Sequence, residues 1–360
     1  FGRSVESVSP ICPSHNSAMR RKQRFALPLL LLLAGFGLVV ASLCCGSVEL
    51  TLGEVGSALF GGETSDTARA IVLDYRLPRL LTALTVGASL GLCGLITQTL
   101  FENPLADPSL FGIHAGAAVG AAAGPLIWSS GALLFLRTLP PLAGELFGVI
   151  MALCGALLVL ALIVQLARKQ FHGTALLVAG VMISFVLSSV LALMAYFSTT
   201  DGLRSFQLWT LGDFSSVGRM RLPLFEAALL LPVAYCWRQT TTLDAWLLGE
   251  NYARTLGIDP RRSRSRLLFA VGWITAWSTA FCGPVAFVGL AAPHAARLLS
   301  GTSLHRRNLP MTLAVGALLA LACQFLCALP WPSGTLPLNA VTPLIGAPIV
   351  FLLLMRRPSH

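Results

Sequence analysis

Long apolar segments alternate with short polar ones along most of the chain. The apolar runs are about 18–25 residues long, the length that a helix needs to cross the hydrocarbon core of a bilayer. Strands of a membrane barrel would be shorter and would alternate apolar and polar positions, and these runs do not. The pattern therefore predicts an all-α polytopic membrane protein. Ten transmembrane helices are expected, at residues 25–47, 78–101, 110–128, 146–167, 174–198, 222–237, 267–285, 286–300, 310–329 and 338–355.

Residues 238–266 form the one long polar segment in the middle of the chain, RQTTTLDAWLLGENYARTLGIDPRRSRSR. Between Asp244 and Leu256 the spacing of apolar residues predicts one short amphipathic helix outside the bilayer. Gly257 is expected to end this helix, and Asp259-Pro260 to start the next one. The apolar positions are Ala245, Leu248, Tyr252, Ala253 and Leu256.

Two interpretations of this amphipathic segment stay open. It folds back onto its own transmembrane helices, or it docks a soluble subunit that moves the membrane part. We favour docking, because an apolar face outside the bilayer needs a protein surface to cover it. That face is expected to carry Trp246, Leu248, Tyr252 and Leu256.

Composition agrees with a membrane protein. The 360 residues are 55% hydrophobic and 11% charged, with a mean hydropathy of +0.77, values that no soluble domain of this length has. The net charge of +10 lies mostly in loops, so it does not indicate a nucleic-acid partner. With the N-terminus in the cytoplasm, most lysines and arginines fall on the cytoplasmic side, and an even number of spans returns the C-terminus there.

Residues 1–24 are set apart as an N-terminal tail. The stretch FGRSVESVSPICPSHNSA precedes Met19 and has no apolar core. It is interpreted as an expression-derived extension, a misassigned start or a disordered tail. Residues 25–357 are expected to form a single transmembrane domain, with 238–266 as its cytoplasmic loop.

Small residues recur on the faces of the second and third predicted spans. Spacings of three and four residues between glycines let helices approach closely in lipid. Asn103-Pro104 and Asp107-Pro108 predict a tight turn between these two spans. The glycines are Gly87, Gly91, Gly94, Gly112, Gly116, Gly120 and Gly124.

Two longer segments are expected on the outer side. Residues 48–77 contain a possible short helix, and residues 199–221 carry Phe206, Trp209 and Phe214, which are expected at the bilayer interface. Arginines on this side either snorkel to headgroups or meet an acidic partner that arrives from outside. They are Arg76, Arg79, Arg204, Arg219 and Arg221.

The residues that would make this chain an enzyme or an ion-coupled carrier are missing from the sequence. Lys22 and Lys169 both follow arginine, so no phosphate-binding loop exists and energy from ATP must come from another chain. Only Glu226 falls within a predicted span, with Glu145 at an edge, which argues against proton or sodium coupling. No nucleophile and base stand at a recognisable spacing.

No metal site is expected. His294 follows a proline near the end of a span and is interpreted as structural. Eight cysteines in or beside apolar runs are expected to be small buried residues, not metal ligands or disulfides. They are Cys44, Cys45, Cys93, Cys154, Cys236, Cys282, Cys323 and Cys327.

Six motifs, in order along residues 25–357, resemble the permease family of bacterial type II ABC importers for iron-siderophores, haem and cobalamin. The resemblance implies a homodimer in the bacterial inner membrane, with both termini cytoplasmic, ten spans per subunit and a central path. It also implies two cytoplasmic ATPase subunits, which supply ATP hydrolysis without a permanently bound cofactor, and a periplasmic substrate-binding protein. The motifs are RLPR at 76–79, GASLGLCGLITQTLFENPLADPSLFGIHAGA at 87–117, LWTLGD at 208–213, LLGENYARTLGI at 247–258, GPVAFVGLAAPHAARLLSG at 283–301 and LIGAPIVFLLL at 344–354.

The resemblance also implies site residues. Arg76 and Arg79 are expected to meet acidic residues of the binding protein. Where the family often has Ala-Asp and then Arg near the outer end of the ninth span, this chain has Cys323, Gln324 and Ala328. Docking is therefore either weaker or supplemented by Arg204, Arg219 or Arg221. Two short helices in the family's loop dock into the ATPase, through positions that are here Leu248, Gly249, Glu250, Tyr252, Ala253, Leu256 and Gly257.

The expected cargo is a chelate or macrocycle, because no cluster of His, Cys and carboxylates stands in the spans to bind a naked metal. Haem is favoured, since LRSFQLWTLGD at 203–213 resembles the corresponding segment of haem permeases. A ferric siderophore or cobalamin is the alternative. An ion-coupled secondary transporter is the rival from another class.

Overall fold

The computed structural model describes residues 16–129, 141–169, 173–198, 200–331 and 334–355. Within these ranges the chain is helical, and the only β-type pairing is an isolated bridge between Trp331 and Gly334. The predicted all-α fold is confirmed.

Each of the ten predicted spans coincides with a helix. Their ends differ from the prediction by a few residues in most cases, which is the usual uncertainty of hydropathy patterns. The helices are α1 (Asn16–Cys44), α4 (Leu77–Leu100), α5 (Ile113–Ser129), α6 (Pro141–Arg168), α7 (Gly173–Tyr196), α9 (Leu222–Arg238), α12 (Pro260–Cys282), α13 (Val288–Ser300), α14 (His305–Ala328) and α15 (Leu338–Met355).

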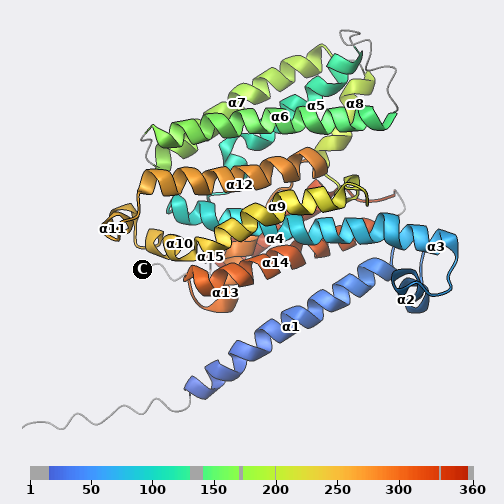
Figure 1. Ribbon diagram of the computed structural model, residues 1–360, viewed down its shortest axis with the longest axis horizontal. Coiled ribbons are helices and arrows are strands. Elements are labelled where there is room, and N and C mark those ends of the chain that lie inside the picture. Colours follow the sequence, from blue (N-terminus) through green and yellow to red (C-terminus); the bar gives the residue numbers. More distant parts are fainter. Residues whose placement is uncertain (1–15, 130–140, 170–172, 199, 332–333, 356–360) are drawn as a thin grey trace, which may run out of the picture.

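The remaining helical elements are short, and Figure 1 shows α2 and α3 at one end of the bundle and α10 and α11 at the other. Residues 48–77, where one short helix was expected, contain two and a π-helical turn. The elements are α2 (Leu52–Phe60), α3 (Asp66–Ala70), the π-helical turn η1 (Ile71–Arg76), the 3-10 turn η2 (Pro108–Phe111), α8 (Thr200–Thr210), the 3-10 turn η4 (Phe214–Ser216), α10 (Thr240–Trp246) and α11 (Glu250–Thr255).

Length and composition mark only part of these helices as membrane spans. Four described stretches are long and apolar enough to cross: 66–100, 146–168, 173–196 and 305–328. Three shorter apolar helices occupy 29–44, 113–124 and 338–352. α13 has 13 residues and is therefore about 20 Å long, less than the ~30 Å hydrocarbon core. The count of ten spans stays a prediction.

α1 begins at Asn16, before the predicted start at residue 25, so the last residues of the predicted tail are helical. Helix formation needs no apolar stripe in these residues, because it only extends a helix already nucleated by the span. Figure 1 shows α1 running at an angle to the bundle, with its C-terminal end beside α2. Residues 1–15 lie outside the described part of the chain.

α4 occupies the centre of the bundle and packs against α14, α13, α12 and α9. Glycines make this close approach possible, as predicted. A Cβ atom built on Gly87 would lie 2.4 Å from the carbonyl oxygen of Gly316, and one on Gly94 only 1.7 Å from that of Gly289. Glycines also allow close packing of α5 on α6, where a Cβ on Gly116 would lie 2.6 Å from the carbonyl oxygen of Gly155.

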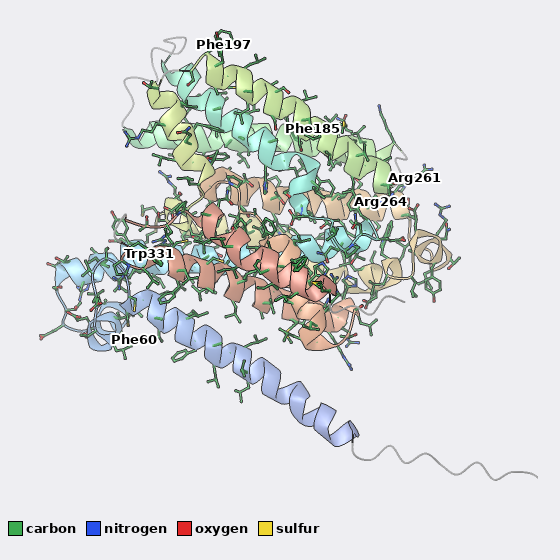
Figure 2. The ribbon with its side chains drawn as sticks, turned by 180° about the vertical axis from the view of Figure 1, so that it is seen from behind. Phe60, Phe185, Phe197, Arg261, Arg264 and Trp331 are labelled. Atoms are coloured by element: carbon green, nitrogen blue, oxygen red, sulfur yellow. The ribbon has the colours of Figure 1, made fainter. Side chains whose placement is uncertain are left out.

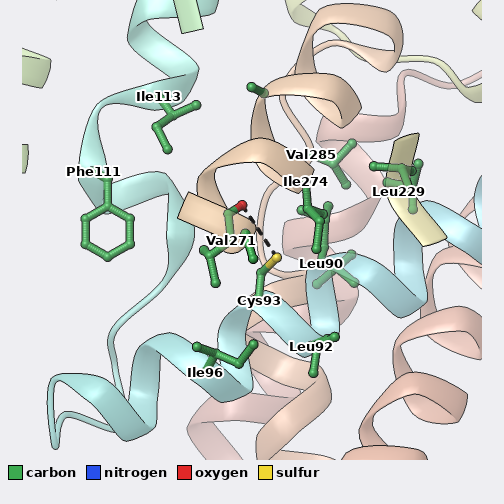
Figure 3. Packing of buried hydrophobic residues seen from close by; sticks show 14 of the residues in the cluster. Leu90, Leu92, Cys93, Ile96, Phe111, Ile113, Leu229, Val271, Ile274 and Val285 are labelled. Carbon is green, nitrogen blue, oxygen red and sulfur yellow. Dashed lines mark hydrogen bonds between the residues drawn. The ribbon is translucent and has the colours of Figure 1, made fainter. Parts of the chain in front are cut away.

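Buried apolar side chains of α4 pack against neighbouring helices (Figure 3). Cys93 of α4 faces α12, and its Sγ lies 3.7 Å from the carbonyl oxygen of Val271. Of the eight cysteines expected to be buried, five are, but Cys45 and Cys154 are exposed and Cys44 is half-buried. The prediction is wrong for these, because an apolar run in a membrane protein can face lipid as well as the core.

The predicted turn between α4 and α5 is confirmed. Asn103 accepts a hydrogen bond from the N–H of Leu105 (2.9 Å), and Asp107 accepts one from that of Ser109 (3.0 Å). His294 of α13 closes over this turn, with its Nε2 2.8 Å from the carbonyl oxygen of Pro104. His294 therefore contributes to the structure, as expected.

The aromatic residues of the outer segment do not share one environment. Phe206 and Trp209 stack with their ring centroids 6.1 Å apart. Phe214 is 1% exposed and belongs to the core, so its predicted interfacial position is wrong. It sits in η4, which Asp213 caps by accepting the N–H of Ser215 (2.9 Å), and this turn directs the ring inward.

Candidate functional site

The polar segment 238–266 folds into two short helices, α10 and α11, in place of the single amphipathic helix expected from apolar spacing. The break lies at Gly249, whose φ of +96° and ψ of 160° no helix accommodates. Gly257, with φ +80°, follows the end of α11, and Asp259 caps α12 by accepting the N–H groups of Arg261 and Arg262. The expected stop and restart are therefore confirmed.

Trp246, at the end of α10, is 1% exposed. Its Nε1 donates to Ser263 Oγ at 3.2 Å, and the Arg264 guanidinium carbon lies 5.0 Å from its ring centroid. The predicted outward position of Trp246 is wrong, because the indole anchors α10 to the first turns of α12. Ala253 is also fully buried, so it adds no atoms to the outer face.

What remains outside is an apolar surface formed by four side chains, here called the α10–α11 surface. Leu248, Tyr252 and Leu256 are 65%, 47% and 57% exposed. Leu247, which sequence reasoning missed, is 39% exposed. Figure 2 places Arg261 and Arg264 at this end of the molecule, and Phe60 and Trp331 at the opposite end.

Glu250 fixes α11 to α12 and is not a free contact group. Its carboxylate accepts from Arg264 at 2.6 Å and from Arg254 at 3.4 Å. The Arg264 side chain is 7% exposed, and a charge-assisted bond of this kind is stronger than one between neutral groups. The α10–α11 surface is therefore held rigidly against α12.

A second connection joins α10 to the bundle and was not foreseen. Asp244 Oδ1 accepts the backbone N–H of His305 at 2.6 Å and lies 3.0 Å from its Nδ1. The other ring nitrogen, Nε2, lies 2.9 Å from Thr99 Oγ1. Because His305 begins α14 and Thr99 lies near the end of α4, this chain links α10 to both helices.

The arginines expected to dock a partner lie at the opposite end, and the structure separates them. Arg76 donates to the carbonyl oxygens of Leu43, at 2.5 Å, and of Val48. Arg79, with a side chain 22% exposed, lies 3.6 Å from Asp213. Both therefore have partners within the chain.

The other three arginines lie outside the cavity that Arg76 and Arg79 line. That cavity has a volume of about 570 Å³ and also contains Gln324 and Ala328, where the chain departs from the family pattern. Arg219 is 61% exposed and lies 3.1 Å from Asp74, Arg204 is exposed and Arg221 is half-buried.

The comparisons with known proteins agree with this architecture. The sequence pattern of the FecCD transport family matches residues 30–357. The chain belongs to this family. It is 37% identical to the vitamin B12 import system permease protein of Klebsiella pneumoniae, over 94% of this chain and 95% of that one. It is 34% identical to the protein of the same name from Citrobacter koseri, again over 94% and 95%.

A solved structure of a metal-chelate type ABC transporter in an inward-facing conformation has the same fold. The two structures superpose with a TM-score of 0.78 and are 28% identical in sequence, and the match covers 94% of this chain and all of the other. This FecCD chain is thus the membrane permease subunit of an ABC importer. A separate ATPase subunit hydrolyses the ATP, and a substrate-binding protein completes the system.

Proposed function

We propose that this FecCD permease imports a metal-containing macrocycle or chelate, with cobalamin as the favoured cargo. The observation that supports it is the 37% identity to a vitamin B12 permease, which extends over nearly the whole of both chains. Haem, favoured from residues 203–213 alone, has less support, because that stretch covers only residues 203–210 of α8 and the three residues that follow.

We place the α10–α11 surface in the cytoplasm against the ATPase subunit. The basic residues at this end support the orientation, because cytoplasmic ends of spans carry the excess of arginine and lysine. Closure of the ATPase would then press on Leu248, Tyr252 and Leu256. The contacts of Asp244 with His305, and of His305 with Thr99, would transmit that movement from α10 to α14 and α4. Such coupling requires that the ATPase bind the two conformations of the permease with different free energies.

The working assembly is proposed to be a homodimer with two ATPase subunits, in the bacterial inner membrane. α7 supports this arrangement: it is the least buried of the long apolar helices, and Val178, Met182 and Phe185 are 58%, 52% and 63% exposed. Figure 2 shows Phe185 and Phe197 on the same side of the molecule. A second copy or lipid would cover such a face.

Asp244→Ala is expected to lower the amount of cargo imported per ATP hydrolysed by about tenfold, because each lost bond of this kind costs roughly 1.5 kcal/mol or more. The ATPase subunit should still bind, since Asp244 lies behind the α10–α11 surface. Thr242→Ala is the matched control on the same helix, because its hydroxyl donates only to Gln239 in the described structure. If Asp244→Ala imports the same amount of cargo per ATP hydrolysed as the unmodified permease, the Asp244–His305 contact does not transmit the movement.

Arg76→Glu combined with Arg79→Glu is expected to slow association of the substrate-binding protein by roughly tenfold at low salt, and less at high salt. Arg76 also holds Leu43 and Val48, so loop damage could mimic this effect. Arg204→Glu with Arg219→Glu reverses two exposed charges and separates the causes. If both double variants associate at the unchanged rate in low salt, acidic docking at these arginines is wrong.

The cargo is tested with the permease, its ATPase subunit and its binding protein in liposomes. Cobalamin, haem and a ferric hydroxamate are offered separately, and ATP-dependent accumulation is measured. Cobalamin uptake alone is expected. Uptake of haem or of the hydroxamate without cobalamin would overturn the cargo assignment and leave the importer assignment intact.

A further inference from the structure

Residues of α6, α9 and α12 line a groove along α12. Both α6 and α9 pack against α12, and Figure 1 shows the three helices as neighbours. The groove has a volume of about 720 Å³. Apolar side chains line most of its length, from α6 (Val164), α9 (Leu231 and Pro232) and α12 (Phe269 and Trp273). The indole of Trp273 borders the groove in a fixed orientation, because its Nε1 donates a hydrogen bond to the carbonyl oxygen of Ala228 at 3.1 Å.

The groove changes from apolar to basic in the same direction on two of its helices. On α12, Arg262, Arg266, Phe269 and Trp273 follow one another at spacings of four, three and four, so they share one helix face. On α6, Val164 precedes Arg168 by one turn. The charged end of the groove therefore coincides with the ends of these helices that adjoin α10 and α11.

At that end lies a second hollow of about 530 Å³, which shares Arg168 and Arg266 with the groove and is also lined by Arg261 and Arg262. Among the described residues that line it, Asp259 is the one carboxylate, and it already lies 3.3 Å from the Arg262 Nε and caps α12. Arg168 donates to Ser265 Oγ at 3.3 Å. A net positive charge remains, and the planar fork of arginine matches the oxygens of a phosphate.

We infer that this groove binds an acidic phospholipid of the inner leaflet, with its phosphate among Arg168, Arg262 and Arg266 and an acyl chain along Phe269 and Trp273. A free anion would leave the apolar part empty, and a lipid without net charge would leave the arginines uncompensated. Basic pockets between membrane helices on the cytoplasmic side suit such headgroups. The site is separate from the α10–α11 surface and goes beyond the proposed transport function.

The test uses the purified full-length permease in detergent, titrated with phosphatidylglycerol or phosphatidylcholine carrying brominated acyl chains, which quench nearby tryptophans. The signal from Trp273 is the part of the quenching lost in Trp273→Phe. Phosphatidylglycerol is expected to quench it at much lower concentration than phosphatidylcholine. Since each arginine near the headgroup contributes about 1 kcal/mol, Arg168→Gln with Arg266→Gln should weaken phosphatidylglycerol binding roughly thirtyfold.

Arg306→Gln with Arg307→Gln is the matched control, because these exposed arginines begin α14 and do not line the groove. Ala228→Leu narrows the groove without changing its charge and should reduce quenching by both lipids. Equal quenching of Trp273 by the two lipids in the unmodified protein would overturn the inference, as would an equal loss in the control variant. If the assembled ATPase subunit protects Trp273 from quenching by both lipids equally, the groove is a contact site for the ATPase and not for a phospholipid.

Discussion

Leu248→Asp combined with Leu256→Asp is expected to abolish ATP-driven import while the permease stays folded. Both side chains are more than half exposed, so the change removes no core contact. Truncating an interface anchor typically costs about 2 kcal/mol or more, so two such changes should weaken ATPase binding roughly a thousandfold. Co-elution of the ATPase and substrate-stimulated hydrolysis measure the loss.

Leu52→Asp is the matched control for this double variant. Leu52 is 68% exposed but lies on α2, at the opposite end of the bundle. It should leave both measurements unchanged. Gly257→Pro should also uncouple transport, yet its interpretation is less direct, because φ at Gly257 is +80° and the proline ring requires about −65°. Normal co-elution and hydrolysis in the leucine double variant would show that the α10–α11 surface does not contact the ATPase.

Gly94→Ala is expected to have the largest effect on folding of any single methyl addition in the central helix. The new Cβ would meet the carbonyl oxygen of Gly289 at 1.7 Å and the carbonyl carbon at 2.5 Å. These are backbone atoms, so α4 and α13 must separate, and overpacking of this kind costs about 1–3 kcal/mol or more. Yield and thermal stability in detergent should both fall.

Gly148→Ala is the matched control, since a Cβ there meets nothing within 4 Å although the residue also lies in a long apolar helix. Thermal stability equal to that of the unmodified protein is expected for it. The same result for Gly94→Ala would contradict the close packing of α4 on α13.

The sequence was sufficient for features that depend on local pattern. Hydropathy located the ten helices, and glycine spacing located the contacts of Gly87 and Gly94, because both signals repeat with the helix period. It failed at Gly249, since periodicity counts apolar positions and says nothing about a positive φ. It also failed for Trp246, because an amphipathic face can turn toward α12 as readily as toward a partner.

Long-range partners were beyond reach for a different reason. Asp244 and His305 stand 61 residues apart, and no spacing rule joins them. Charge counting likewise placed Arg76 and Arg79 on one side of the bilayer. It could not reveal that the Arg76 guanidinium donates hydrogen bonds to the carbonyl oxygens of Leu43 and Val48. Nor could it reveal that Arg79 lies beside the carboxylate of Asp213.

The energy source of uptake tests most directly whether this permease works as part of an ATP-driven importer. Liposomes containing the permease, with its ATPase subunit inside and its binding protein outside, are loaded with ATP, and cobalamin uptake is followed while ionophores collapse the proton and sodium gradients. Uptake is expected to require ATP and the ATPase subunit and to be unchanged by the ionophores. Uptake by the permease alone, driven by an ion gradient and abolished by the ionophores, would contradict an ATP-driven importer.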